Sequence, residues 1–346
     1  SAGQLVSLSF SGPRSSNLPI LNMRLCRLAG VGEGLKLLRT VIEEFGVSAA
    51  QRILVTGGSG FLGSHVADEL TANDFRVRVF DLKPSRFLRD GQEMFIGDIT
   101  DLDSVRKAMG GAKYVFHFAG LADIDEAADR PRDTVLLNIL GTVNLLEAAR
   151  DAGVERFVFA STVYVYSNAG SFYRASKQAC ERYVEIFREK FGLPFTILRY
   201  GSLYGRRSGR KNTIAQLISD ALERRTMSYP GDGEELREYI HAQDAAVATL
   251  QALGDEYANK HVILTGARAM RVKDVIHMIR EMLPFEVDVQ FGRREGAEHY
   301  RITPYSFNPK IGKKLVVNPF VDMGQGILDC IEEAAADLNL DGEQDG

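Results

Sequence analysis

The chain has 346 residues, more than one hydrophobic core usually serves, which predicts one large domain or two closely joined domains. Apolar residues make up 45% of it and charged residues 25%, with a formal net charge of −4, which argues against global disorder, a dedicated nucleic-acid binder and a membrane-surface protein. Three widely spaced cysteines and the lack of an apolar run of about 18 residues favour a reduced, soluble, cytoplasmic protein without disulfides or membrane spans.

Residues 1–50 are predicted to form an extension outside the main fold. The beginning of this segment contains Ser and Arg but no Asp or Glu, which faintly resembles a transit peptide, although a disordered leader is the preferred interpretation. One amphipathic helix is expected at 34–46, because apolar residues such as Leu35, Leu38 and Phe45 recur every three or four positions. We expect this helix to pack on the main body or on a partner subunit.

From Arg52 onward, short apolar runs alternate with helical patterns. The runs predict strands at 53–55, 77–80, 114–118, 156–160 and 195–198. The helical patterns lie near 61–72, 101–109, 133–152 and 174–191. This alternation predicts an α/β fold with a doubly wound parallel sheet of the Rossmann type over 51–200. The rhythm then loosens, which predicts a smaller, partly interleaved substrate-binding lobe at 201–338 and a tail at 339–346.

A glycine-rich segment, Thr56-Gly57-Gly58-Ser59-Gly60-Phe61-Leu62-Gly63, follows the first predicted strand. Its glycines permit a tight turn and a close approach to a pyrophosphate, and the next helix offers unpaired N–H groups and the positive end of its dipole. Asp81 ends the second strand, where a carboxylate bonds ribose hydroxyls and repels a 2′-phosphate, so NAD is predicted over NADP. Lys83 and Arg86 weaken that preference.

Tyr173 and Lys177 lie four residues apart on one face of a predicted helix. A nearby cation stabilises a phenolate, so we expect the pKa of Tyr173 to be lowered from its usual value of about 10. A lowered pKa would let Tyr173 take a proton from a hydroxyl group near neutral pH. The isolated pattern is common, but its place after the glycine turn, Asp81 and Ser161-Thr162 favours a catalytic role.

These motifs together resemble the extended short-chain dehydrogenase/reductase family, in particular its nucleotide-sugar epimerase/dehydratase branch. The resemblance runs from about Arg52 to Glu333. Further segments carry it: Gly97-Asp98-Ile99, Phe118-Ala119-Gly120, Asn138 with Gly141-Thr142, Leu198 to Gly205, Arg237 to His241, and Arg293-Arg294-Glu295-Gly296. The family's dimers also imply a homodimer, in which the helices near 133–152 and 174–191 pack across a twofold axis.

The resemblance implies a role for each matched position. NAD would be bound by Gly57, Gly60, Phe61, Leu62, Gly63, Asp81, Asp98, Ile99, Ala119, Gly120, Ser161, Tyr173 and Lys177. Tyr173 would be the catalytic acid/base, Lys177 would tune it, and Thr162 would complete the proton path. A nucleotide diphosphate sugar would be bound by Thr162, Ser202, Arg237 and Arg294. No metal ligands are expected.

The segment from Lys190 to Ser219 has no acidic residue but several cations. It could attract a diphosphate or a sugar carboxylate through charge-assisted hydrogen bonds. For Arg210 and Lys211 individually, a position in a solvated loop is the preferred interpretation. Four side chains receive structural interpretations: His65 as a packing or surface residue, His117 and Cys180 as core residues, and His241 as a residue that holds local backbone.

The residues that follow Thr162 restrict which reactions of the family the chain could perform. Dehydratases of the branch carry an Asp-Glu pair there, and decarboxylases a Glu, whereas this chain has Val163 and Tyr164. A C4 epimerase that works through a transient 4-keto sugar is therefore predicted. The alternatives are a nucleotide-sugar or uronate dehydrogenase, a keto-sugar reductase, or a non-catalytic NAD-binding protein. Three departures from the family pattern leave the identity of the sugar and of the nucleotide undecided. The stretch between Thr162 and Tyr173 is short, Ser202 stands where many relatives have Asn, and Ala297 stands where relatives have Asp.

Overall fold

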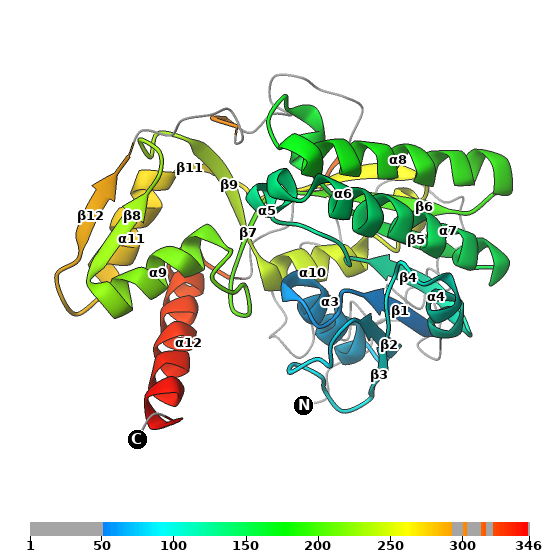
Figure 1. The fold of residues 1–346 in the computed structure, drawn as a ribbon, viewed down its shortest axis with the longest axis horizontal. Coiled ribbons are helices and arrows are strands. Elements are labelled where there is room, and N and C mark those ends of the chain that lie inside the picture. The colour runs from blue at the N-terminus through cyan, green and yellow to red at the C-terminus, as the bar shows by residue number, and fades with distance from the viewer. Residues whose placement is uncertain (1–50, 293–299, 303–312, 316–320, 345–346) are drawn as a thin grey trace, which may run out of the picture. The chain divides into compact units, whose positions relative to one another are not determined.

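Figure 1 shows the fold in a computed structural model, which describes residues 51–292, 300–302, 313–315 and 321–344. All of these residues belong to one compact unit, Ala49–Gly346. The helix predicted at 34–46 and the predicted substrate residue Arg294 lie outside the described residues.

The centre of this unit is a parallel sheet, in which eight strands of the described residues have the order β13-β10-β6-β5-β4-β1-β2-β3. The strand bounds are β1 (Arg52–Thr56), β2 (Arg76–Asp81), β3 (Gln92–Ile96), β4 (Ala112–His117), β5 (Arg156–Thr162), β6 (Phe195–Tyr200), β10 (Lys260–Leu264) and β13 (Lys313–Lys314). The order reverses between β1 and β4, so the loops after these strands diverge and leave a ligand crevice at their carboxyl ends.

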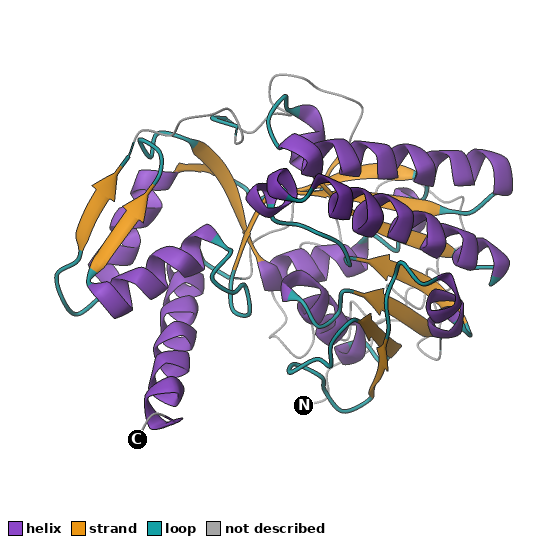
Figure 2. Cartoon of the chain, viewed as in Figure 1, coloured by secondary structure: helices purple, strands orange, loops and turns teal. Residues whose placement is uncertain are grey.

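Helices cover both faces of the sheet, so the predicted doubly wound fold is confirmed (Figures 1 and 2). The helix bounds are α3 (Phe61–Ala72), α4 (Leu102–Met109), α5 (Ile124–Asp129), α6 (Pro131–Thr134), α7 (Gly141–Asp151), α8 (Ser171–Phe191) and α10 (Ala242–Gln251). On one face α7 packs against both α4 and α8, and α3 packs with α10. The helix predicted near 133–152 contains a π-helical turn, Val135–Leu140, which leads into α7.

The smaller part of the unit contains two further sheets. β7 (Ser202–Tyr204), β9 (Leu236–His241) and β11 (Ala269–Arg271) form one, and β8 (Thr226–Tyr229) pairs with β12 (Asp288–Phe291) in the other. Helices α9 (Thr213–Arg224), α11 (Val272–Met282) and α12 (Met323–Gln344) pack with them around an apolar core that includes Ile218, Met227, Ile276 and Ile327. Between these elements the chain returns to the large sheet through α10, β10 and β13, which interleaves the two parts.

Local sequence explains where the elements that position the site begin and end. Asp101 and Asn212 cap α4 and α9 through their side-chain oxygens, which satisfies N–H groups of the first turn. Gly170 and Gly192 bound α8 at left-handed φ values of +98° and +75°, which glycine adopts at little cost. Among the described helices, none combines the length and the apolarity required to cross a membrane.

Candidate active site

The glycine turn lies between β1 and α3 and is shaped for close approach. A Cβ atom on Gly57, whose φ is +71°, would lie 2.6 Å from the Ala119 nitrogen, and a Cβ on Gly63 would lie 2.2 Å from the Gly57 oxygen. Gly60 is the N-cap residue of α3, and no side-chain hydrogen bond caps the first turn there. These features fit the pyrophosphate of a dinucleotide.

Asp81 ends β2 beside this turn, and its Oδ2 accepts a hydrogen bond from the Ser59 amide at 3.0 Å. The Asp98 carboxylate accepts a hydrogen bond from the Thr100 amide at 2.8 Å, and the buried Ile99 packs against Gly141. The predicted cofactor residues of β2 and of the loop after β3 thus flank the carboxyl edge of the sheet. This is the edge at which dinucleotides bind in open α/β sheets.

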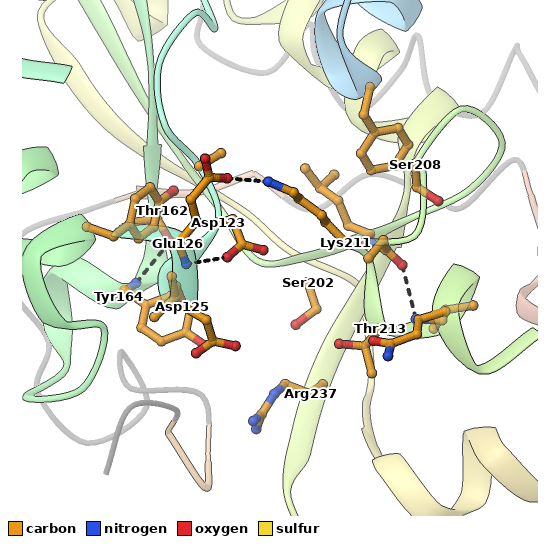
Figure 3. Close-up of a pocket in the computed structure, with 18 of the residues that line it drawn as sticks. Asp123, Asp125, Glu126, Thr162, Tyr164, Ser202, Ser208, Lys211, Thr213 and Arg237 are labelled. Atoms are coloured by element: carbon orange, nitrogen blue, oxygen red, sulfur yellow. Dashed lines mark hydrogen bonds and ion pairs between the residues drawn. The ribbon is translucent and has the colours of Figure 1, made fainter. Parts of the chain in front are cut away.

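A cleft of about 1360 Å³ opens beside the turn, and residues of the large-sheet part and of the smaller part of the unit line it. Of the predicted site residues, Phe61, Gly120, Thr162, Tyr173, Ser202 and Arg237 line it. In Figure 3, Asp123, Glu126 and Thr162 lie on one side of it, Ser208, Lys211 and Thr213 on the other, and Ser202 and Arg237 between them. The Lys177 side chain is buried behind this surface.

The three predicted catalytic residues come together at the end of β5. The phenol of Tyr173 is hydrogen-bonded to the Thr162 hydroxyl, which also accepts a bond from the Tyr164 amide at 3.2 Å. The Lys177 ammonium lies 5.9 Å from the centre of the Tyr173 ring and donates to the Ala160 carbonyl at 2.8 Å. A hydroxyl, a phenol and an ammonium therefore meet beside the cleft.

The predicted lowering of the Tyr173 pKa is wrong for this structure. Burial raises the pKa of Tyr173 to about 12, because a buried phenolate loses its hydration, and the hydrogen bond with Thr162 offsets only part of this. Burial also lowers the pKa of Lys177. The Lys177 side chain is buried and its ammonium donates to the Ala160 carbonyl, whereas Tyr173 is half-buried in the wall of the cleft. The four-residue spacing in the sequence does not show these environments.

Ser161, predicted to contact the cofactor, directs its hydroxyl to the buried Glu181 carboxylate at 2.6 Å. Glu181 in turn accepts two hydrogen bonds from Arg199 on β6. Sequence reasoning did not single out Glu181. Its only local signal was its place four residues after Lys177, one turn along α8.

His117 and Cys180 are core residues, as predicted. The His117 ring lies between the Thr56 and Thr142 hydroxyls, at 2.8 and 2.9 Å, and burial lowers its pKa to about 3. The Cys180 thiol is buried and donates to the Asn138 carbonyl. Neither side chain lines the cleft.

His241 holds local backbone, as expected. Its Nδ1 accepts a hydrogen bond from the Gln243 amide and caps α10, and burial lowers its pKa to about 4. Among the described residues, no group of three or more His, Cys, Asp or Glu side chains is placed to hold a metal ion.

Three side chains that line the cleft contact one another. The Arg237 guanidinium lies 4.3 Å above the centre of the Tyr300 ring, and that ring lies 4.7 Å from the ring of Tyr164. Tyr300 also hydrogen-bonds Ser202. Sequence reasoning missed Tyr300. It lies 61 positions after Tyr239 of β9, and the folding of the chain brings both side chains to the cleft.

The basic segment from Lys190 to Ser219 does not form the free cationic patch that its sequence suggested. Most of its cations pair with carboxylates from distant elements: Arg199 with Glu181, Arg206 with Glu332, Arg207 with Asp68, Arg210 with Glu223 and Lys211 with Glu126. Arg210 and Lys211 are exposed, as expected for a solvated loop. The pairing partners lie up to 139 positions away, so local composition could not reveal them.

Comparison with known proteins decides the family. The model of the NAD dependent epimerase/dehydratase family matches residues 53–265. The chain belongs to this family. It is therefore an NAD-dependent enzyme of the epimerase/dehydratase family, and the predicted cofactor type is confirmed.

Similar proteins include several named as epimerases. A UDP-glucose 4-epimerase of Rhizobium meliloti is 30% identical to this epimerase/dehydratase family member over 288 residues, covering 70% of this chain and 86% of that protein. The UDP-glucose 4-epimerase of Thermotoga maritima, solved with UDP-glucose, has a TM-score of 0.73 at 26% identity, covering 83% of this chain and 100% of that chain. The Thermus thermophilus enzyme, solved with NAD, has a TM-score of 0.70 at 27% identity, covering 82% and 99%.

Proposed function

We propose that this enzyme is a nucleotide-sugar 4-epimerase that works through a transient 4-keto sugar. The observation that carries the proposal is the meeting of Thr162, Tyr173 and Lys177 beside the cleft, with Val163 and Tyr164 at the positions that follow Thr162. Val163 is buried and apolar, so it cannot move the protons that elimination requires. A phenol–hydroxyl pair suffices for the proton transfers of reversible oxidation at a carbinol.

The chain would hold the cofactor at the carboxyl edge of the sheet. Gly57, Gly60 and Gly63 would hold the pyrophosphate, and Asp81 would bind the adenosine ribose. Asp98 with Ile99 would border the adenine. When bound, NAD supplies a hydride acceptor and, in the reverse sense, a hydride donor.

The proton chemistry would be performed by Tyr173 and Thr162. The raised pKa of Tyr173 keeps it protonated near neutral pH, so positive charge must stabilise its phenolate before it acts as a base. The Lys177 ammonium is one such charge. Tyr173 would take the proton of the sugar O4 hydroxyl and return it to the same oxygen, with Thr162 hydrogen-bonded beside it.

We infer that the substrate is a nucleotide diphosphate sugar. Arg237 lies in the wall of the cleft and, together with Arg294, would face the diphosphate; Ser202 would lie near the sugar. UDP-glucose is the first candidate, because the similar proteins described above are named UDP-glucose 4-epimerases. A cytoplasmic location and a homodimer complete the proposal.

The test is turnover of UDP-glucose and related nucleotide sugars, followed by proton NMR, in the wild type and in Tyr173→Phe. Loss of the phenolic proton path should lower kcat by about 10²–10⁴-fold with little change in NAD affinity. Tyr183→Phe, which alters an exposed tyrosine of the same helix, is the matched control and should remain active.

Two outcomes would contradict the proposal. Stoichiometric release of NADH without interconversion of sugar isomers would favour a dehydrogenase. An inactive wild type whose NAD affinity is unchanged in Tyr173→Phe would favour a non-catalytic NAD-binding protein.

A further inference from the structure

A buried ion pair lies behind the catalytic side chains and contacts the elements that carry them. The Glu181 carboxylate on α8 accepts two hydrogen bonds from Arg199 on β6, at 2.9 and 2.7 Å, and one from Ser161 on β5, at 2.6 Å. Arg199 also donates to the Tyr166 hydroxyl, at 2.6 Å, at the end of the 3-10 turn that begins after Thr162. The Arg199 and Glu181 side chains are only 6% and 8% exposed.

The hydrogen bond between Glu181 and Ser161 joins α8 to β5, and a second hydrogen bond joins the same two elements beside it. Lys177, one helical turn before Glu181, donates to the carbonyl of Ala160, the residue that precedes Ser161. Two consecutive residues of β5 therefore hold two consecutive turns of α8, and the next residue of β5 is Thr162. A displacement at Glu181 would move the catalytic side chains of α8 relative to Thr162.

Stability alone does not account for an ion pair in this place. Removing two charges from water is costly, and an apolar pair of similar volume is often as stable or more stable. What the ion pair adds is directed geometry, because the bidentate contact between Arg199 and Glu181 fixes both separation and orientation.

The Glu181 charge also acts on the Lys177 ammonium. Burial lowers the pKa of Lys177, and interactions with Cys180 and Glu181 oppose that effect. The other titratable groups around Lys177 do not take over this role near neutral pH: the pKa of His117 on β4 is lowered to about 3, and burial raises the pKa of both Tyr173 and Cys180. Glu181 is therefore the anion that supports Lys177, even while it pairs with Arg199.

We propose that Glu181 is a positioning residue whose ion pair with Arg199 sets the placement of Tyr173 and Lys177 against β5 and holds a carboxylate one helical turn from Lys177. Glu181 acts through Tyr173 and Lys177. The expected effect of Glu181 on kcat rests on the proposed function, whereas its expected effect on the titration of Lys177 does not. Neither Glu181 nor Arg199 lines the cleft.

The test compares Glu181→Gln with Glu185→Gln. Both remove a carboxylate charge from α8 with little change of shape, but Glu185 lies one turn further along and pairs with Arg182 and His261. In Glu181→Gln we expect kcat to fall about 10–100-fold, from misplacement of the catalytic groups, with KM and NAD affinity changed less than about threefold. The alkaline limb of the kcat profile should move to lower pH, because Lys177 loses its proton more readily. Glu185→Gln should match the wild type in all four quantities.

A second measurement follows Lys177 without any sugar substrate. The Lys177 pKa, titrated by NMR of proteins carrying ¹³Cε-lysine and assigned with Lys177→Arg, should be lower in Glu181→Gln than in the wild type. Glu181→Asp keeps the charge and should restore the Lys177 titration more fully than kcat.

Unchanged titration of Lys177 together with an unchanged alkaline limb would overturn the inference. If Glu181→Gln does not fold, the apolar pair Glu181→Met with Arg199→Leu replaces it, and a wild-type kcat in that double variant would equally overturn the inference. A wild type that turns over no nucleotide sugar defeats the proposed function instead, since the titration of Lys177 still reports on Glu181.

Discussion

At the scale of single residues, burial decides how the ionisable groups in the site and in the core behind it behave. His117 has the geometry of a neutral ring held by two hydroxyls, and the Lys177 charge adds to the lowering of its pKa. Tyr173 is protonated for a related reason, because the charged form of either side chain would lose its hydration. Catalytic use of Tyr173 therefore depends on charges that its surroundings supply.

His117 makes the stability of the protein depend on pH. Its pKa is about 3 in the folded protein against an ordinary 6.5, so the unfolded chain binds this proton first as the pH falls. The contribution is fully present above pH 6.5 and is lost toward pH 3, at about 1.4 kcal/mol per pH unit. Between pH 6.5 and 4.5 we expect the free energy of unfolding to drop by roughly 2–3 kcal/mol from this residue.

Urea unfolding at a series of pH values measures this loss. His117→Gln removes the titrating ring and should show a shallower pH dependence than the wild type, whatever its absolute stability. Equal slopes in the two proteins would contradict the prediction. His241, whose pKa is lowered to about 4, adds to the loss of stability at low pH equally in the wild type and in His117→Gln.

At the scale of elements, the turn between β1 and α3 combines two requirements at adjacent positions. Gly57 adopts a positive φ, and Gly63 lets the first turn of α3 lie directly on the Gly57 carbonyl. Gly57 is required for its backbone conformation, and Gly63 is required because a side chain there would clash with the Gly57 carbonyl.

We expect Gly63→Ala to weaken NAD binding by roughly tenfold or more, because the added methyl group must displace the Gly57 backbone from 2.2 Å. Isothermal titration calorimetry measures the change. Gly153→Ala is the control, since a Cβ there meets nothing within 4 Å and its φ of +66° makes the substitution costly for stability alone. Equal NAD affinities in Gly63→Ala and the wild type would show that the turn does not approach the pyrophosphate.

At the scale of the whole molecule, apolar side chains stay exposed on the neighbouring helical segments 135–140 and α8. The larger ones are Val135, Leu136, Leu140, Phe172, Tyr183, Ile186 and Phe191. These segments pack against each other within the chain. Exposed apolar surface of this kind on two adjoining helices favours a self-complementary twofold contact.

We therefore expect a dimer of twice 38.3 kDa in sedimentation equilibrium. Ile186→Glu should shift the equilibrium toward monomer, since it places a charge in the apolar contact. Leu328→Glu, at an exposed leucine of α12, should leave the mass unchanged. A monomeric wild type would remove the dimer from the proposal.

Much of the fold followed from local pattern, and the exceptions have physical reasons. The five predicted strands are all present, because each is a short apolar run between turns. Three strands of the large sheet, β3, β10 and β13, were not predicted. β3 is a partly exposed edge strand with Gln92 and Glu93, and β10 returns to the large sheet after the smaller part has begun.

The sequence by itself located the glycine turn after β1, Asp81 at the end of β2 and the Tyr173–Lys177 pair on one helix face, because each of these features depends on short spacing and on residue chemistry. The roles of these residues toward NAD and a sugar are part of the proposal. Only the tertiary structure decided the protonation of Tyr173, the neutralisation of the basic segment and the entry of Tyr300 into the cleft. Burial and ion pairing join residues that are far apart in the chain, and their energies depend on hydration and distance, which no local spacing specifies.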